Sequence, residues 1–369
     1  MWATTHAGGF SMSDNYEAAV RDRSAEQVAE FREPQTLGRR FQSALHTTPA
    51  LVPLIVLLVS VVLFASLVGS RFFSAGTLTL ILQQVQLVGI VAAAQSLVIM
   101  TAGIDLSVGA IAVVSSVVMG QFAFRYGIPP VLAVGCGLAV GTALGYLNGW
   151  LVAVMKLPPF IVTLGTWQII LASNFLYSRN ETIRAQDITA EAPILQFFAQ
   201  TFKIGADADG RGGATFTYGV IFMLVLIAIL AYALRSTAWG RHVYAVGDDP
   251  DAAQLSGVNV RSTLISVYAL SGLICAFAGW ALIGRIGSVS PTSGAELNIQ
   301  SITAVVIGGI SLFGGRGSIA GALFGALIVG VFSLGLRLLG VDPQWTFFFI
   351  GVLIIVAVAV DQWIRKVAA

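Results

Sequence analysis

Long apolar stretches separated by short polar connections dominate the sequence from residue 50 onward. They lie at 50–69, 78–101, 106–124, 129–154, 158–176, 217–234, 262–283, 299–313, 318–336 and 344–363. Most are long enough to cross a bilayer as helices, for which about 20 apolar residues are needed. Because an open sheet in lipid would leave backbone groups unpaired, the pattern predicts an all-α polytopic membrane protein with about ten transmembrane helices.

One of these stretches is too short and too rich in glycine for an ordinary span. The stretch 299–313 contains Gly308 and Gly309, and transporters break their helices at short, glycine-interrupted segments. We therefore expect some short or broken spans. The segments 98–109 and 306–321 both run from an apolar stretch through glycines into a new span, which leaves an internal repeat open.

Composition supports the membrane class and argues against others. Apolar residues make up 56% of the 369 residues and charged residues only 10%, whereas a soluble domain carries about 25% charged residues. The chain should therefore sit in membrane lipid. A formal net charge of +2 and the lack of Lys/Arg-rich runs give no support to nucleic-acid binding.

The distribution of charge divides the chain into two parts. Residues 1–48 hold 11 of the 38 charged residues and form a polar N-terminal tail, whereas 49–369 form the transmembrane domain. Ten crossings place both termini on one side of the membrane. Placing that side in the cytoplasm gives 12 basic residues inside and eight outside. The positive-inside rule therefore favours cytoplasmic termini, although charge alone leaves the reverse orientation open.

Glycines repeat every four residues in two of the predicted spans. This spacing places them on one helix face, where a neighbouring backbone can approach closely. We interpret both faces as packing surfaces inside one bundle, with a subunit interface as the alternative. The residues are Gly137, Gly141, Gly145 and Gly149 in the fourth span, and Gly317, Gly321 and Gly325 in the ninth.

The connection 235–261 contains a segment that predicts one short helix. Asp249 can cap the helix N-terminus, Pro250 suits the first turn, and Gly257 suits a left-handed stop. The residue chemistry alone leaves two interpretations open, a solvated loop helix and a helix that docks on a cytosolic partner. The residues that would carry docking are Asp248, Asp249, Pro250, Ala252, Leu255 and Gly257.

Polar residues in or beside the spans are candidates for a translocation pathway. Asp105 is the only acidic residue between positions 34 and 180. Its place between two spans predicts an N-cap for the third span, and a charged residue near the membrane is also a functional candidate. Amides and hydroxyls can bind sugar hydroxyls or join helices. The pathway candidates are Asp105, Asn148, Thr163, Gln168, Asn298 and Gln300.

The sequence shows no catalytic or metal-binding motif. It lacks the G-x-x-x-x-G-K-[ST] phosphate loop and the H-E-x-x-H zinc motif, and its three histidines lie outside the spans. It also lacks a chain of Asp, Glu or His deep in the spans, which proton- or sodium-coupled carriers often have. We therefore expect no enzyme activity, no cofactor and no metal in this chain.

Three separated motifs resemble a known family. The segments 101–109 (TAGIDLSVG), 246–260 (VGDDPDAAQLSGVNV) and 305–330 occur in this order. They resemble the hallmark segment, the cytoplasmic coupling segment and the late glycine-rich signature of membrane permeases in bacterial ABC sugar importers of the ribose and branched-chain amino-acid type. The resemblance runs from about residue 50 to the C-terminus. Within the family, the segments 270–291 and 361–369 look most similar to fructose permeases.

The resemblance to ABC permeases implies a function and a set of partners. It implies ATP-driven import of a monosaccharide across the inner membrane, with fructose as the first substrate and ribose, xylose or another small solute as alternatives. It also implies a cytosolic ATPase subunit that hydrolyses the ATP, a periplasmic sugar-binding protein and a second permease subunit, which forms a homodimer with this chain or, alternatively, a pseudo-dimer. The predicted helix at 249–256 then becomes the coupling helix. A rival from another class is a secondary carrier that works without ATP, which needs no such helix.

Overall fold

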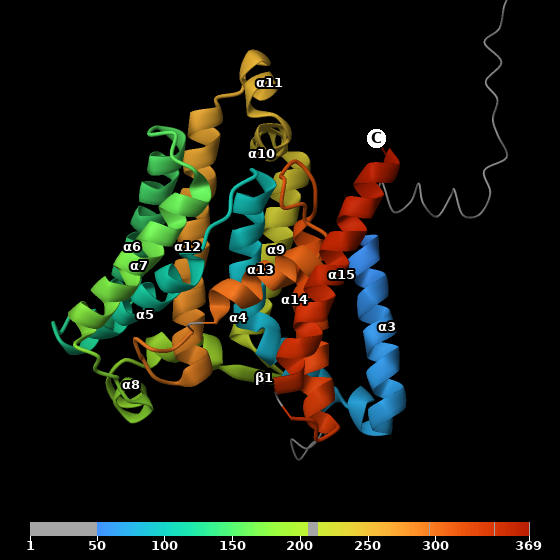
Figure 1. Ribbon diagram of the computed structural model, residues 1–369. Coiled ribbons are helices and arrows are strands. Elements are labelled where there is room, and N and C mark those ends of the chain that lie inside the picture. The colour runs from blue at the N-terminus through green and yellow to red at the C-terminus, as the bar shows by residue number, and fades with distance from the viewer. Residues whose placement is uncertain (1–49, 206–212, 295, 343, 369) are drawn as a thin grey trace, which may run out of the picture. The chain divides into compact units, whose positions relative to one another are not determined.

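The computed structural model describes residues 50–205, 213–294, 296–342 and 344–368, so the predicted tail at 1–48 lies outside the described residues. Within these ranges the chain forms a helical bundle (Figure 1). In the described part of the chain, seven helices are long and apolar enough to cross a membrane. They are α3 (Leu51–Val68, continued by the 3-10 turn η1, Gly69–Phe73), α4 (Ala75–Met100), α6 (Pro130–Ala153), α7 (Pro159–Ser178), α9 (Tyr218–Ser236), α12 (Val260–Ile286) and α14 (Ile319–Leu338).

Three further apolar helices lie in the described ranges. They are the shorter helices α5 (Val108–Phe124) and α13 (Leu297–Ile307), and α15 (Gln344–Ala368). The 11 residues of α13 give a length of only about 17 Å, roughly half of a 30 Å hydrocarbon core. The prediction of an all-α polytopic protein with short or broken spans is therefore confirmed.

Small elements cover the two ends of this bundle (Figure 1). At one end, called the α11 end here, α9 is connected to α12 by α10 (Ala238–Asp248) and α11 (Pro250–Leu255). At the opposite end, called the sheet end, α7 is connected to α9 by α8 (Ala185–Glu191), the 3-10 turn η2 (Pro193–Ala199) and the antiparallel strands β1 (Thr201–Ile204) and β2 (Ala214–Thr217). The connection 235–261 thus holds two helices where the sequence predicted one.

Two segments between helices bring the chain back into the bundle. After α4 reaches the α11 end, residues 101–107 run back toward the middle, where α5 begins (Figure 1). Residues 308–318 run from the end of α13 to the α11 end, where α14 begins (Figure 1). In the most apolar window of α4 and of α12, 72% of residues are buried, against 17% for α3, so α4 and α12 form the centre and α3 the periphery.

The glycines of α6 lie in tight helix–helix contacts. A Cβ at Gly145 would overlap the carbonyl oxygen of Tyr268 on α12 and lie 2.9 Å from the Gly272 Cα atom. A Cβ at Gly141 would lie 2.6 Å from the Cβ atom of Ala276. These contacts lie within one chain, and they bring the α6 and α12 backbones closer together than any larger residue allows.

The glycines near the start of α14 make a second contact of the same kind. A Cβ at Gly321 would overlap the carbonyl oxygen of Gly308, and one at Gly325 would overlap the carbonyl oxygen of Ala304 on α13. Gly317, just before α14, lies against Ile310. The short helix α13 is therefore held against α14 by backbone-to-backbone approach.

Candidate functional site

Helix α11 is capped by the residues that the sequence predicted. The Asp249 carboxylate accepts the backbone N–H groups of Asp251 at 2.9 Å and Ala252 at 3.0 Å. Pro250 is the first helical residue. Gly257 follows the helix with a φ of +86°, a left-handed conformation that glycine adopts at little steric cost. Local chemistry alone therefore sets where this helix begins and ends.

The surface of α11 combines exposed carboxylates with one protruding apolar side chain. Ala253 faces inward and is buried, whereas Asp248 and Asp249 are exposed. Leu255 is 91% exposed, more than any other large hydrophobic residue in the described ranges. A leucine held out by a capped helix is a geometry that fits a pocket on a partner protein.

Behind α11, helix α10 packs against two other parts of the chain. The Gly315 N–H donates to the Met100 carbonyl oxygen at 3.0 Å, and Gly247 lies so close to both residues that no Cβ would fit. The Tyr244 hydroxyl donates to the Gly317 carbonyl oxygen at 2.9 Å. Burial raises the pKa of Tyr244, so the hydroxyl stays protonated as a donor. We call these five residues the coupling junction.

A second cluster lies where α5 begins. The Asp105 carboxylate accepts the backbone N–H of Ser107 at 2.7 Å and its hydroxyl at 2.6 Å. The Asn148 amide donates to the same Ser107 hydroxyl at 2.9 Å. The predicted N-cap role of Asp105 is wrong, because Ser107 occupies the N-cap position and Asp105 shapes the turn just before the helix.

Two more predicted residues hold the backbone around this turn. The Thr163 hydroxyl donates to the Ile104 carbonyl oxygen at 2.9 Å. The Asn298 amide donates to the Leu106 carbonyl oxygen at 2.6 Å, and its oxygen accepts the Gly109 N–H at 2.5 Å. Asn298 is the second residue of α13 and Gly109 the second of α5. The N-terminal ends of the two short helices therefore meet here.

Four of the six pathway candidates thus converge on one short segment, 104–109. We call the five side chains that hold it the polar junction: Asp105, Ser107, Asn148, Thr163 and Asn298. All five are buried. Their contacts position the start of α5, and within the described ranges only the Asn148 oxygen among their buried side-chain atoms has no hydrogen-bond partner.

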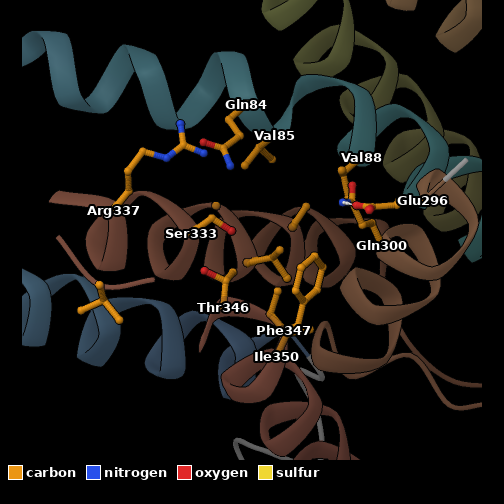
Figure 2. A pocket seen from close by; sticks show the side chains of 14 residues that line it. Gln84, Val85, Val88, Glu296, Gln300, Ser333, Arg337, Thr346, Phe347 and Ile350 are labelled. Carbon is orange, nitrogen blue, oxygen red and sulfur yellow. Dashed lines mark hydrogen bonds between the residues drawn. The ribbon is translucent and has the colours of Figure 1, made fainter. Parts of the chain in front are cut away.

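The remaining two pathway candidates lie elsewhere. Gln168 is exposed on α7. Gln300 lines a pocket of about 200 Å³ between α4, α13, α14 and α15 (Figure 2). A smaller cavity of about 170 Å³ lies between α5, α7 and the start of α13, lined by Asn298, Asn174 and Trp167.

Sequence analysis missed the coupling junction. The residues around Tyr244 in the sequence do not indicate its role, because its hydrogen-bond partner Gly317 lies 73 residues away. Ser107 and Asp105 are both residue types that favour the N-cap position, and the charge of Asp105 favoured it in the prediction.

Comparison with known proteins supplies the family. The family described as branched-chain amino acid transport system permease component matches residues 77–358. The Fructose import permease protein FrcC of Rhizobium meliloti is 68% identical over 357 residues, 97% of each chain.

More distant relatives are also sugar permeases by name. The Ribose import permease protein RbsC of Bacillus subtilis is 35% identical over 301 residues, which cover 82% of this chain and 89% of that protein. The Galactose/methyl galactoside import permease protein MglC of Escherichia coli is 33% identical over 302 residues, 79% of this chain and 88% of that protein. No solved structure matches. The chain therefore belongs to the permease component family of branched-chain amino acid transport systems.

Proposed function

We propose that this chain is the permease subunit of an ATP-driven ABC importer that carries fructose across the bacterial inner membrane. The observation that carries the proposal is the 68% identity to a fructose import permease over 97% of both chains. The geometry of α11 supports it, since a capped helix with Leu255 91% exposed suits docking on an ATPase. A secondary carrier has no use for such a helix.

We assign the α11 end to the cytoplasm. Arg235, Arg241, Arg261 and Arg316 lie in or beside the connections at that end, in keeping with the positive-inside rule. The chain termini then face the cytoplasm as well. The sheet end faces the periplasm, where a sugar-binding protein would deliver its ligand onto the surface formed by α8 and the β1–β2 pair.

In this proposal the ATPase moves the permease through two connected junctions. A displacement of α11 passes to α10 and then to the coupling junction. From there, Met100 leads into the segment 101–107 and Gly315 leads back to the end of α13. Both routes end at the polar junction, where Asn298 joins α13 to the start of α5. ATP hydrolysis takes place on the separate subunit, and this chain supplies the path and the gate.

A second copy of the chain completes the proposed permease as a homodimer. Helices α3 and α7 expose many large apolar side chains, among them Leu176 at 81% and Val62 at 66%. Such surfaces are stable only against lipid or another apolar chain. Part of these faces would pack against the second copy in the homodimer, and the rest would contact lipid.

The test of the proposal is uptake of labelled fructose in the source bacterium with the gene deleted and then restored. Unlabelled ribose, xylose and galactose are added as competitors. We expect deletion to abolish uptake, restoration to return it, and only fructose to compete. Survival of fructose uptake after deletion would overturn the substrate assignment. Failure of an ATPase subunit to copurify in mild detergent, in repeated preparations, would favour the secondary carrier instead.

A further inference from the structure

The pocket in Figure 2 combines an apolar lining with several polar side chains, which are uncommon in this chain. It lies between α4, α14, the first turns of α15 and the start of α13, and has a volume of about 200 Å³. Its lining includes both a carboxylate, Glu296, and a guanidinium, Arg337, together with the amides of Gln84 and Gln300. Only 10% of the chain is charged, and ionisable groups within membrane-spanning regions mark functional sites by default.

Most of these polar groups have capacity left for a ligand. The Gln300 amide donates to one carboxylate oxygen of Glu296 at 3.1 Å, which leaves the second oxygen of Glu296 available. In the part of the chain that the structure describes, the side chains of Gln84, Ser333 and Arg337 bond to no other protein group. Polar groups beside lipid are costly unless a ligand or water satisfies them.

The pocket has two polar ends and an apolar wall. Figure 2 shows the Arg337 guanidinium on α14 directed toward the Gln84 amide on α4, while Glu296 and Gln300 lie together at the other end. Phe347 of α15 lines the pocket and is 57% exposed, so its ring is open to contact. Donors and acceptors at both ends, with an aromatic face between them, match a ring that carries hydroxyls on its edge and C–H groups on its face.

The balance of charge indicates a neutral ligand. One acid and one base in the same pocket favour neither an anion nor a cation. A lipid tail has no hydrogen-bonding group and would leave Gln84, Glu296 and Arg337 without a partner. A polyhydroxyl compound can donate to the Glu296 carboxylate and accept from the Arg337 guanidinium at the same time.

The pocket also connects the sheet end with the middle of the bundle. Arg337 lies in the last turn of α14, at the sheet end, whereas Val88 lies 13 residues after Ala75, the first residue of α4. Val88 therefore lies about 20 Å along α4 from its first residue, near the middle of this 26-residue helix. Glu296 directly precedes α13 and lies two residues from Asn298 of the polar junction.

We propose that this pocket is a monosaccharide-binding subsite inside the permease, entered from the sheet end. Gln84, Glu296, Gln300 and Arg337 bind the sugar hydroxyls, and Phe347 packs against the ring. Because Glu296 is continuous with α13, an occupied pocket bears directly on the polar junction. This inference rests on the proposed function, and it adds a place where the sugar contacts the permease itself rather than its binding protein.

The first test is transport by the assembled importer, with its ATPase and binding protein, in vesicles. Wild-type uptake of fructose is measured first, and its absence would overturn the proposed function itself. Glu296→Gln and Phe347→Ala are then compared with matched controls outside the pocket, Glu181→Gln and Phe348→Ala. Phe348 neighbours Phe347 and is 58% exposed, but it does not line the pocket. We expect Glu296→Gln to lose about tenfold or more in rate, as for loss of a hydrogen bond to a charged group. Phe347→Ala should also lower the rate, because it removes the aromatic contact with the sugar ring, and the controls should stay within about twofold.

A second test detects occupancy directly and does not depend on transport by a damaged variant. Ser333→Cys in the pocket and Ser70→Cys on the exposed η1 turn are labelled with a maleimide, after Cys136→Ala removes the partly exposed native thiol. We expect fructose to slow labelling at position 333 and to leave position 70 unchanged. Equal labelling with and without fructose, together with pocket variants that match their controls in a transporting importer, would overturn the subsite and leave the proposed function standing.

Discussion

Two aspartates show how the same residue type takes different roles in this protein. Asp249 accepts the N–H groups of Asp251 and Ala252 and begins α11. Asp105 accepts the N–H and the hydroxyl of Ser107, and this places it ahead of α5 rather than on it. The first carboxylate is exposed and the second is buried, with 2% exposure. One therefore shapes a surface for a partner, and the other shapes a turn inside the bundle.

The role of Asp249 can be separated from its charge. Asp249→Ala removes the N-cap, which costs about 1 kcal/mol of helix stability, and we expect fructose uptake and copurification of the ATPase to fall. Asp249→Asn keeps an oxygen acceptor that caps equally well, so it should behave like the wild type. If both variants lose uptake equally, the carboxylate contacts the partner through its charge and capping is secondary.

At the scale of elements, glycine decides which helices are held together. On the face of α6 that meets α12, a Cβ at Gly145 or Gly149 would enter the space of the α12 backbone. By contrast, Gly135 on the same helix has open space around it. The close approach brings backbone and side-chain atoms into contact along several turns, which is how membrane helices associate without a hydrophobic driving force.

This contrast makes a matched pair for a stability measurement. Gly145→Ala forces a Cβ against the Tyr268 carbonyl, and we expect it to destabilise the protein by about 1–3 kcal/mol through overpacking. Gly135→Ala places the same atom in open space and should be neutral or slightly stabilising, by up to about 1 kcal/mol. Thermal unfolding midpoints in detergent compare the two. Identical midpoints would show that α6 can move away from α12 at no cost.

The elements also show which parts of the site could be predicted from sequence. Helix α11 could be, because its cap, its proline and its stop lie within nine residues of one another. The candidates Asn148, Thr163 and Asn298 could be chosen as polar residues in spans, but their convergence on 104–109 could not. Their partners lie 41, 59 and 189 or more residues away. Residues so far apart in the sequence give no indication that they are in contact until the arrangement of α5, α7 and α13 is known.

For the whole molecule, two tightly packed helix pairs flank a hydrogen-bonded centre. The pair α6–α12 and the pair α13–α14 are each joined by close backbone contacts at glycines. The polar junction between them is joined by side-chain hydrogen bonds, which can break and re-form. We therefore expect conformational change to occur at the polar junction, with the two pairs moving as rigid units.

The link between the α11 end and this centre is open to a direct test. Tyr244→Phe removes the donor to the Gly317 carbonyl oxygen and leaves that acceptor without its partner, at a cost of about 1–3 kcal/mol. We expect fewer fructose molecules transported per ATP hydrolysed. Tyr232→Phe is the control, because Tyr232 lies on α9 and is 70% exposed. An unchanged ratio of transport to hydrolysis in Tyr244→Phe would remove Tyr244 from the coupling route.

The hydrogen bonds of Asn298 join groups that are synthesised at different times. The Leu106 carbonyl and the Gly109 N–H are synthesised 192 and 189 residues before the side chain that satisfies them. Until then, these groups need water or a chaperone as a substitute partner. Helix α13 is itself too short to enter the membrane as an independent span. A chain truncated before α13 would therefore lack the side chain that bonds to both groups at the start of α5.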